Sequence, residues 1–191
     1  MLAAMLAKIP CDVEDFGIVT DDLSAMTATF EAARQADIII STGGASVGDH
    51  DLVRPAFAAA GGSLNFWKIR MRPGKPLMAG SIGAATFVGL PGNPVSAFVT
   101  ATLFVMPLIA HLSGSRSPLP ATGSAPLATA IEATGDRDNY LRARITGEGA
   151  VALTAQDSAA TRALADADCL IVRPAGSPAA LPGTPVTILH L

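Results

Sequence analysis

The stretch "ADIIISTGGASVGDHD", residues 36–51, decides the fold of this chain. Its three consecutive isoleucines form a short apolar run, which is typical of a strand buried on both faces of a parallel sheet. The run stops at Gly43 and Gly44, and a third glycine, Gly48, follows closely. A strand that ends in a glycine-rich turn indicates a layered α/β domain, in which ligands bind at the carboxyl ends of strands.

The sequence around this stretch alternates between helix and strand patterns. Helix patterns cover residues 21–36, 52–62 and 93–114, and strand patterns cover residues 64–72, 76–82 and 85–90. The last two strands flank Gly83 and predict a hairpin. The alternation predicts a layered α/β/α domain with a mostly parallel sheet over residues 1–114.

The composition changes after Gly114. Residues 115–124 are rich in Ser, Pro and Gly and predict a linker. Residues 125–191 contain short apolar segments separated by turn residues, which predicts a small β domain. The chain is thus expected to contain two domains joined by a linker.

The composition also excludes some classes of function. Only 15% of the residues are charged and the net charge is −3, whereas a nucleic-acid-binding face is strongly basic. The longest apolar stretch, residues 97–112, contains Pro107 and is shorter than the roughly 20 residues of a membrane span, so we expect a buried helix. Two cysteines without metal-ligand spacing, Cys11 and Cys169, fit reduced thiols in a cytoplasmic protein.

The glycine-rich turn is the first candidate binding feature. Glycines allow the backbone to approach a ligand, and successive N–H groups form a cradle for an anion. Asp49 and Asp51 follow the cradle and would suit a Mg²⁺ ion that bridges to phosphate oxygens. A tight turn without ligand, followed by carboxylates that cap the next helix, remains the alternative.

A group of cationic residues follows in the predicted strand 64–72. Because side chains alternate along a strand, Lys68, Arg70 and Arg72 are expected on one face, with Lys75 just beyond the end. The chain has only 13 cationic residues, so this row favours a polyanionic ligand. A charged edge strand that discourages aggregation would have the same pattern.

A helix start completes the set of candidate features, in "GLPGNPVSAF", residues 89–98. Asn93 is a good N-cap, Pro94 suits the first helical position, and Ser96 lies in the first turn. The free N–H groups of a helix N-terminus attract oxyanions, although a plain capped helix is equally compatible. Together these features predict a site for a phosphorylated or oxyanionic ligand with Mg²⁺.

Three motifs, "STGGASVGDHD", "KIRMRPGKP" and "GLPGNPVSAF", resemble in this order the C-terminal half of the molybdopterin molybdenumtransferases, the MoeA family that includes the gephyrin E domain. The resemblance implies a molybdopterin-binding α/β domain followed by a small β-barrel-like domain. It also implies insertion of molybdenum from molybdate into adenylylated molybdopterin, with release of AMP and with Mg²⁺, in molybdenum cofactor biosynthesis.

The resemblance further assigns roles to individual residues. The implied catalytic residues are Asp21, Asp51, Lys68 and Lys75, and Asp51 is also the implied metal ligand. The implied substrate-binding residues are Gly43, Gly44, Ser46, Gly48, Arg72, Pro76, Pro91, Pro94, Ser96, Arg142 and Ser158. Among these, Arg142 matches the family's anion-binding arginine and Ser158 its serine partner.

The chain departs from the family pattern in three respects. Arg72 stands where lysine is usual, and Asp157 stands where glycine is usual. Family members carry two further N-terminal domains and an acidic opening strand, and they form homodimers. We therefore expect this chain to be a fragment whose sheet lacks one strand.

Two other functions remain open at this stage. A molybdopterin adenylyltransferase shares the α/β fold and uses ATP, but the helix start and the β domain favour the molybdenumtransferase. A truncated, non-catalytic binding or scaffold module is the other alternative.

Overall fold

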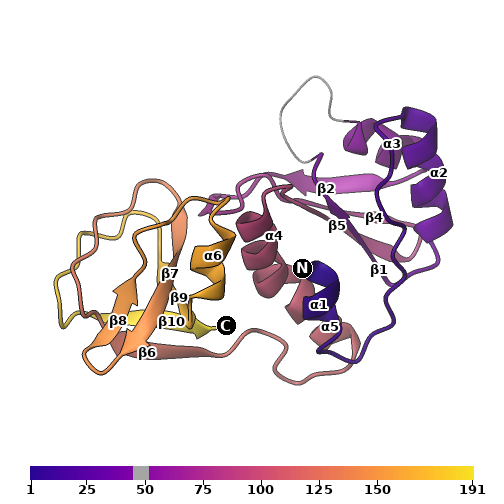
Figure 1. Cartoon of the computed structure of the whole chain (residues 1–191). Coiled ribbons are helices and arrows are strands. Elements are labelled where there is room, and N and C mark those ends of the chain that lie inside the picture. Colours follow the sequence, from indigo (N-terminus) through magenta and orange to yellow (C-terminus); the bar gives the residue numbers. More distant parts are fainter. Residues whose placement is uncertain (45–51) are drawn as a thin grey trace.

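The computed structural model describes residues 1–44 and 52–191. The N-terminal unit contains a four-stranded sheet and its helices (Figure 1). Its elements are α1 (Leu2–Leu6), α2 (Leu23–Ala33), β1 (Ile38–Thr42), α3 (Val53–Ala59), β2 (Ser63–Trp67), β4 (Met78–Ile82) and β5 (Ala85–Leu90). A continuous helix follows, made of α4 (Pro94–Thr100), the π-helical turn η1 (Ala101–Val105) and α5 (Met106–Leu112).

Helices cover both faces of this sheet, whose strand order is β1-β5-β4-β2. On one face, Phe30 of α2 and Phe57 of α3 pack on Phe87 of β5, with ring centroids 5.6 and 4.2 Å away. On the other face, Val88 and Leu90 belong to a core that also includes residues of α1, α4 and α5. The prediction of an α/β fold is confirmed.

The prediction of a mostly parallel sheet is wrong. Among the strands described, β1 and β5 pair in parallel, whereas β5 with β4 and β4 with β2 are antiparallel. The predicted hairpin explains the error, because Gly83, at a φ of +59°, lets β4 turn directly into β5. Such short connections join antiparallel strands, while parallel neighbours need a longer crossover. An apolar strand therefore does not by itself indicate a parallel sheet.

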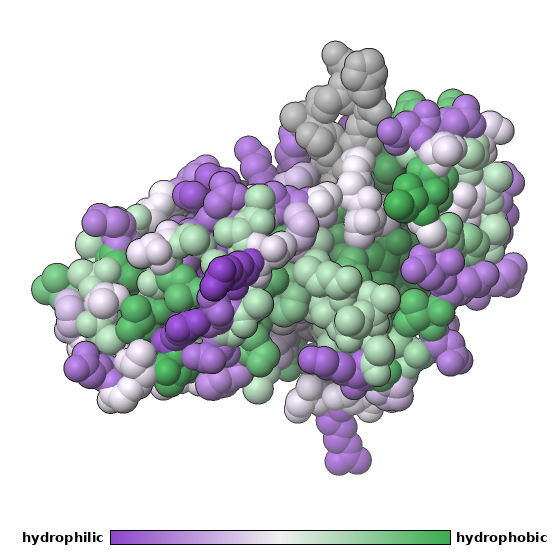
Figure 2. Space-filling model, in the orientation of Figure 1, coloured by the Kyte–Doolittle hydropathy of each residue, from purple (hydrophilic) through white to green (hydrophobic). Residues whose placement is uncertain are grey.

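The long helix Pro94–Leu112 is apolar and long enough to cross a membrane by length and composition alone. In the structure it packs through Ala97, Ala101 and Val105 against the sheet of the N-terminal unit. Figure 2 shows largely apolar surface in the centre of the view, where Figure 1 places α1 and α4. The helix is therefore a partly buried core element, in agreement with the buried helix that the sequence predicts.

The C-terminal unit is a six-stranded sheet with one short helix. Its elements are β3 (Met71–Arg72), β6 (Thr122–Pro126), β7 (Asp138–Thr146), β8 (Gly149–Ala152), α6 (Thr161–Ala165), β9 (Cys169–Arg173) and β10 (Pro185–His190). The strand order is β3-β7-β9-β10-β6, and β8 pairs with β7. Buried side chains such as Leu127, Ile171 and Ile188 form its core. Strand β6 begins inside the predicted linker, residues 115–124, and continues two residues beyond it.

This second sheet is strongly curved but open. Its ends approach each other where Leu127, just after β6, forms a single bridge to Ala150 of β8. The backbone N–H of Ala128 donates to the carbonyl of Ala150 at 2.9 Å. Because no continuous ladder joins β6 to β8, the expected barrel-like closure is not confirmed.

The two units are joined by strand pairing and by an apolar core. Strand β3 precedes β4 in the chain but pairs with β7, with Met71 opposite Asp138. Val95 and Val99 of α4 pack in one buried cluster with Leu170 of β9 and Leu189 of β10. These contacts fix the orientation of the two units relative to each other.

The approach of β6 to β8 depends on Gly149, and this generates a prediction. Gly149 has a φ of +126°, and an added Cβ would lie 2.1 Å from the carbonyl oxygen of Pro126. Gly149→Ala should reduce the free energy of unfolding by about 2 kcal/mol or more, measured by urea denaturation. Gly147→Ala is the control, because its Cβ would meet nothing within 4 Å. Equal effects of the two substitutions would contradict this account of the closure.

Candidate functional site

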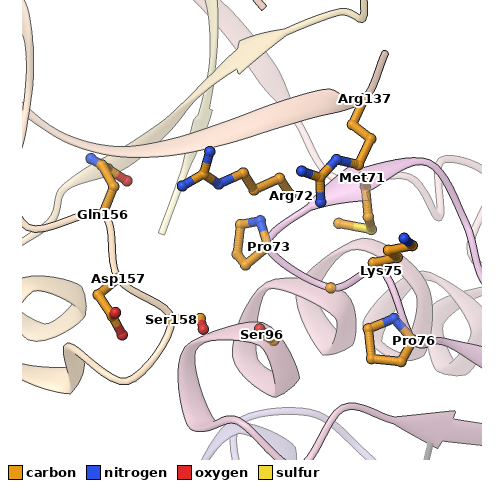
Figure 3. A pocket seen from close by; sticks show the side chains of 11 residues that line it. Met71, Arg72, Pro73, Lys75, Pro76, Ser96, Arg137, Gln156, Asp157 and Ser158 are labelled. Atoms are coloured by element: carbon orange, nitrogen blue, oxygen red, sulfur yellow. The ribbon is translucent and has the colours of Figure 1, made fainter. Parts of the chain in front are cut away.

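A pocket of about 310 Å³ lies at the junction of the two units (Figure 3). The N-terminal side is formed by the turn that follows β3 and by the start of α4. The C-terminal side is formed by the segment before β7 and by the turn before α6. The lining residues are Met71, Arg72, Pro73, Gly74, Lys75, Pro76, Ser96, Arg137, Gln156, Asp157 and Ser158. The pocket thus brings together five residues from distant segments of the chain to which the family resemblance assigns substrate-binding or catalytic roles. They are Arg72, Lys75, Pro76, Ser96 and Ser158.

The predicted cationic row on a single strand is wrong. Strand β2 ends at Trp67, and Lys68 has a φ of +85°, which turns the chain out of the sheet. The ammonium of Lys68 lies over the Trp67 ring, 4.0 Å from the ring centroid, and does not line the pocket. Side-chain alternation therefore does not continue from Lys68 to Arg72.

The turn between β3 and β4 positions Lys75. The backbone N–H of Ile69 donates to the carbonyl of Lys75 at 3.1 Å, so the turn is closed at its base. Gly74, at a φ of +112°, is pressed against the long helix, and an added Cβ would lie 2.5 Å from the Cγ2 atom of Thr100. Only glycine fits this position without a shift, and the packing holds the exposed Lys75 at the rim of the pocket.

The start of α4 forms the floor of the pocket. Asn93 is the N-cap residue and Pro94 begins the helix, as the sequence predicts. Ser96 is only 5% exposed and lines the pocket. The backbone N–H of Val95 donates to the carbonyl of Ser158 at 3.2 Å, which links this helix start directly to the C-terminal unit. Because Ser96 follows Val95 in the chain, this bond brings Ser96 and Ser158 next to each other at the pocket (Figure 3).

Arg142 is placed behind the pocket wall and is only 2% exposed. Its guanidinium donates to the carbonyls of Ala155 and Asp157, each at 2.9 Å. The Gln156 side chain donates in turn to the carbonyl of Arg142 at 2.9 Å. Burial lowers the pKa of Arg142 while the charge of Asp157 opposes the shift, and the guanidinium remains charged. In this structure Arg142 shapes the turn that presents Asp157 and Ser158.

The described part of the glycine-rich turn, Gly43 and Gly44, is not among the residues that line this pocket. Gly43 and Gly44 follow β1 at positive φ, and the N–H of Gly43 donates to the carbonyl of Leu90 at 3.2 Å. An added Cβ on Gly92 would lie 3.1 Å from the Cα of Gly43, so the turns after β1 and β5 touch. Neither glycine lines the pocket described above.

Several other candidates fall outside the pocket. Pro91 is buried and Pro94 is exposed, and both shape the turn before α4. Asp21 is exposed and precedes Asp22, whose side chain caps α2 by accepting from the N–H of Ala25. Three further candidates lie outside the residues that the structure describes, namely Ser46, Gly48 and Asp51.

The sequence reasoning assigned no role to two polar residues of the pocket, Arg137 and Gln156. Arg137 precedes β7, and it reaches the site because β7 pairs with β3 at Met71 and Arg72. That pairing joins segments more than 60 residues apart and leaves no local sequence pattern. Gln156 lies within the turn that Arg142 supports, and its side chain accepts a hydrogen bond from the backbone N–H of Arg142.

The resulting lining has a clear chemical character. Three cationic side chains, Arg72, Lys75 and Arg137, line the pocket together with the hydroxyls of Ser96 and Ser158. Cationic groups and hydroxyl donors are the groups that bind tetrahedral oxyanions such as phosphate. The pocket is therefore suited to a small oxyanion or to a phosphorylated ligand.

Comparisons with known proteins show which family the two units belong to. Residues 1–111 match the family described as the probable molybdopterin binding domain, and residues 124–191 match the MoeA C-terminal region, domain IV. A molybdopterin molybdenumtransferase from Haemophilus influenzae is 45% identical over 113 residues, which cover 59% of this chain and 28% of that protein. One from Staphylococcus aureus strain COL is 31% identical over 182 residues, which cover 93% of this chain and 43% of that protein.

A solved structure gives the same answer for the fold. The molybdopterin biosynthesis MoeA protein from Pyrococcus horikoshii superimposes with a TM-score of 0.76 at 27% identity, covering 91% of this chain and 42% of that one. The chain spans less than half the length of these relatives. Its two matched regions, their order and the superposition confirm the resemblance, and the chain belongs to the MoeA family.

Proposed function

We propose that this chain acts in molybdenum cofactor biosynthesis as the substrate-binding part of a molybdopterin molybdenumtransferase. The reaction inserts molybdenum from molybdate into adenylylated molybdopterin and releases AMP. The observation that carries the proposal is the pocket at the junction of the two units, lined by three cations and two serines. Molybdate is a tetrahedral oxyanion, so its charge and shape suit this lining.

Within the pocket, the cationic residues and the serines would make different interactions with molybdate. Arg72 and Lys75 would offset the negative charge of molybdate. The hydroxyls of Ser96 and Ser158 would donate hydrogen bonds to its oxygens, and Pro76 would limit the space beside Lys75. An oxyanion whose charge is offset can approach a phosphate-bearing second substrate with less repulsion.

The second substrate would bind along the turns at the end of the first sheet. Gly44 has no side chain to cover its backbone N–H, which suits a phosphate group, whereas the N–H of Gly43 already donates to the carbonyl of Leu90. Gly43 touches the turn that contains Gly92, between Pro91 and Pro94. Roles for Asp21, Lys68, Ser46 and Gly48 rest on the family resemblance alone.

A role for Mg²⁺ also rests on the resemblance. Within residues 1–44 and 52–191, no group of three or more His, Cys, Asp or Glu side chains could hold a metal ion. Among the described lining residues Asp157 is the only carboxylate, and the three cations that share the pocket repel a divalent cation. The described residues therefore do not fit Mg²⁺, and Asp51, which lies outside them, remains the proposed ligand.

Two further proposals concern the oligomeric state and the cellular location of the protein. By analogy with the family we propose a homodimer and a cytoplasmic location. The reduced state of its two cysteines fits this location, since Cys11 and Cys169 form no disulfide.

A non-catalytic binding module is the second candidate function. It is compatible with the same pocket, because cations and hydroxyls that bind an oxyanion serve binding as well as turnover. Such a module would bind molybdate or molybdopterin without turnover.

The deciding experiment measures molybdate-dependent release of AMP from adenylylated molybdopterin, with Mg²⁺ present. The Haemophilus influenzae relative serves as the positive control. AMP release by this chain supports the transferase. Binding of molybdate by the folded chain without release supports the binding module, and formation of adenylylated molybdopterin from ATP would identify an adenylyltransferase instead.

Lys75 provides a test of the anion pocket. Lys75→Gln removes a cation from the lining and should weaken molybdate binding roughly tenfold, measured by isothermal titration calorimetry. The matched control is Lys8→Gln, because Lys8 is equally exposed but lies outside the pocket. If both substitutions leave the affinity unchanged, molybdate does not bind at this pocket.

Arg142 provides a test of how the pocket wall is built. Arg142→Met removes two hydrogen bonds to backbone carbonyls and should lower the free energy of unfolding by about 2–3 kcal/mol. Arg144→Met is the control on the same strand, where the exposed ion pair with Asp166 contributes about 1 kcal/mol or less. Chemical denaturation of both variants measures the difference, and a smaller loss for Arg142 than for Arg144 would refute the assignment.

A further inference from the structure

Arg137 is the pocket cation that follows the linker in the chain, whereas Arg72 and Lys75 precede it. Arg137 comes just before β7, and its side chain lies near that of Lys75 and away from Asp157 (Figure 3). Its ion pair is with the neighbouring Asp136, at 3.8 Å from Nε, and the Asp136 side chain is 86% exposed. Such an exposed pair is weak, so the guanidinium keeps donors available for a ligand.

Asp157 is the acidic residue of the same pocket. Its Oδ1 atom accepts a hydrogen bond from the backbone N–H of Ala159 at 2.7 Å. This bond fixes the carboxylate in the turn before α6, so the negative charge is held near the pocket. A carboxylate in this position repels an anion and must be outweighed by the surrounding cations.

The balance of these charges favours one class of anion. The lining contains three cationic side chains, Arg72, Lys75 and Arg137, and one carboxylate, Asp157. A doubly charged anion neutralises the remaining positive charge, whereas a singly charged anion leaves part of it unpaired. Without Arg137 the lining would keep a single excess positive charge.

We propose that Arg137 is a third anion-binding residue and that Asp157 is its counter-charge, so that the two residues tune the pocket to a doubly charged tetrahedral oxyanion. This inference rests on the proposed function, since it concerns the same pocket. It assigns to this pair a role in specificity, apart from the role of Lys75 in binding.

The test compares two tetrahedral anions, molybdate with two negative charges and perrhenate with one. Isothermal titration of the 191-residue chain measures both affinities for Arg137→Gln, Asp157→Asn and the double variant. Asparagine keeps the side-chain oxygen that accepts from Ala159, so Asp157→Asn removes the charge alone. Circular dichroism and thermal unfolding check that each variant is folded.

The expected effects follow from Coulomb's law. Arg137→Gln should weaken molybdate binding roughly tenfold and perrhenate binding only about threefold, because the interaction energy scales with the charge of the anion. Asp157→Asn should tighten molybdate binding about threefold. The double variant should bind molybdate more tightly than Arg137→Gln alone.

The outcomes separate this inference from the proposed function. If Lys75→Gln loses binding but Arg137→Gln stays within about twofold of the unchanged chain, the inference fails and the anion pocket stands. If Asp157→Asn weakens binding, Asp157 acts through the turn and not through its charge, which also overturns the inference. If the folded chain binds neither anion, the proposed function and the inference both fail.

Discussion

The site depends on the apolar contact between the long helix and the C-terminal sheet. Val95 and Val99 pack with Leu170 and Leu189, and each fully buried side chain of this size contributes roughly 1.5–3 kcal/mol. Val95 also donates its N–H to the carbonyl of Ser158, so the packing and a polar contact hold the same junction. Because the pocket walls belong to different units, this junction fixes the distance between them.

The pocket concentrates cations in a chain that otherwise has few. Three of the 13 cationic residues line one small pocket, where their mutual repulsion opposes the folded state. Partial exposure to water reduces this cost, since Arg72 and Lys75 both remain exposed. An anion that binds relieves the repulsion and binds only to the folded chain, so ligand binding and stability are coupled. Arg142 differs from these exposed cations, because its guanidinium is buried and donates hydrogen bonds to backbone carbonyls of the protein itself.

The elements of the fold could be predicted from local patterns, whereas their pairing could not. The Asn93-Pro94 pair marks the start of α4 correctly, because a helix start depends on neighbouring residues only. The direction of pairing depends on connections, so the parallel prediction fails at the β4–β5 hairpin. The continuous strand fails at Lys68, because a positive φ in a non-glycine residue has no signature in an alternating pattern. The family resemblance selects five pocket residues, but Arg137 enters through a long-range strand pair that no motif contains.

Arg72 stands where the family resemblance implies lysine, and the pocket shows what an arginine contributes at this position. Figure 3 shows the Arg72 guanidinium extended toward Gln156 of the C-terminal unit, whereas Lys75 stays on the opposite side near Arg137. A guanidinium offers two parallel N–H donors in a rigid plane, while an ammonium is a compact point charge. Arginine at this position therefore keeps the charge and adds directional donors that span the pocket between the two units. The positive charge of the lining is thus kept, and the guanidinium reaches across the pocket toward Gln156 (Figure 3).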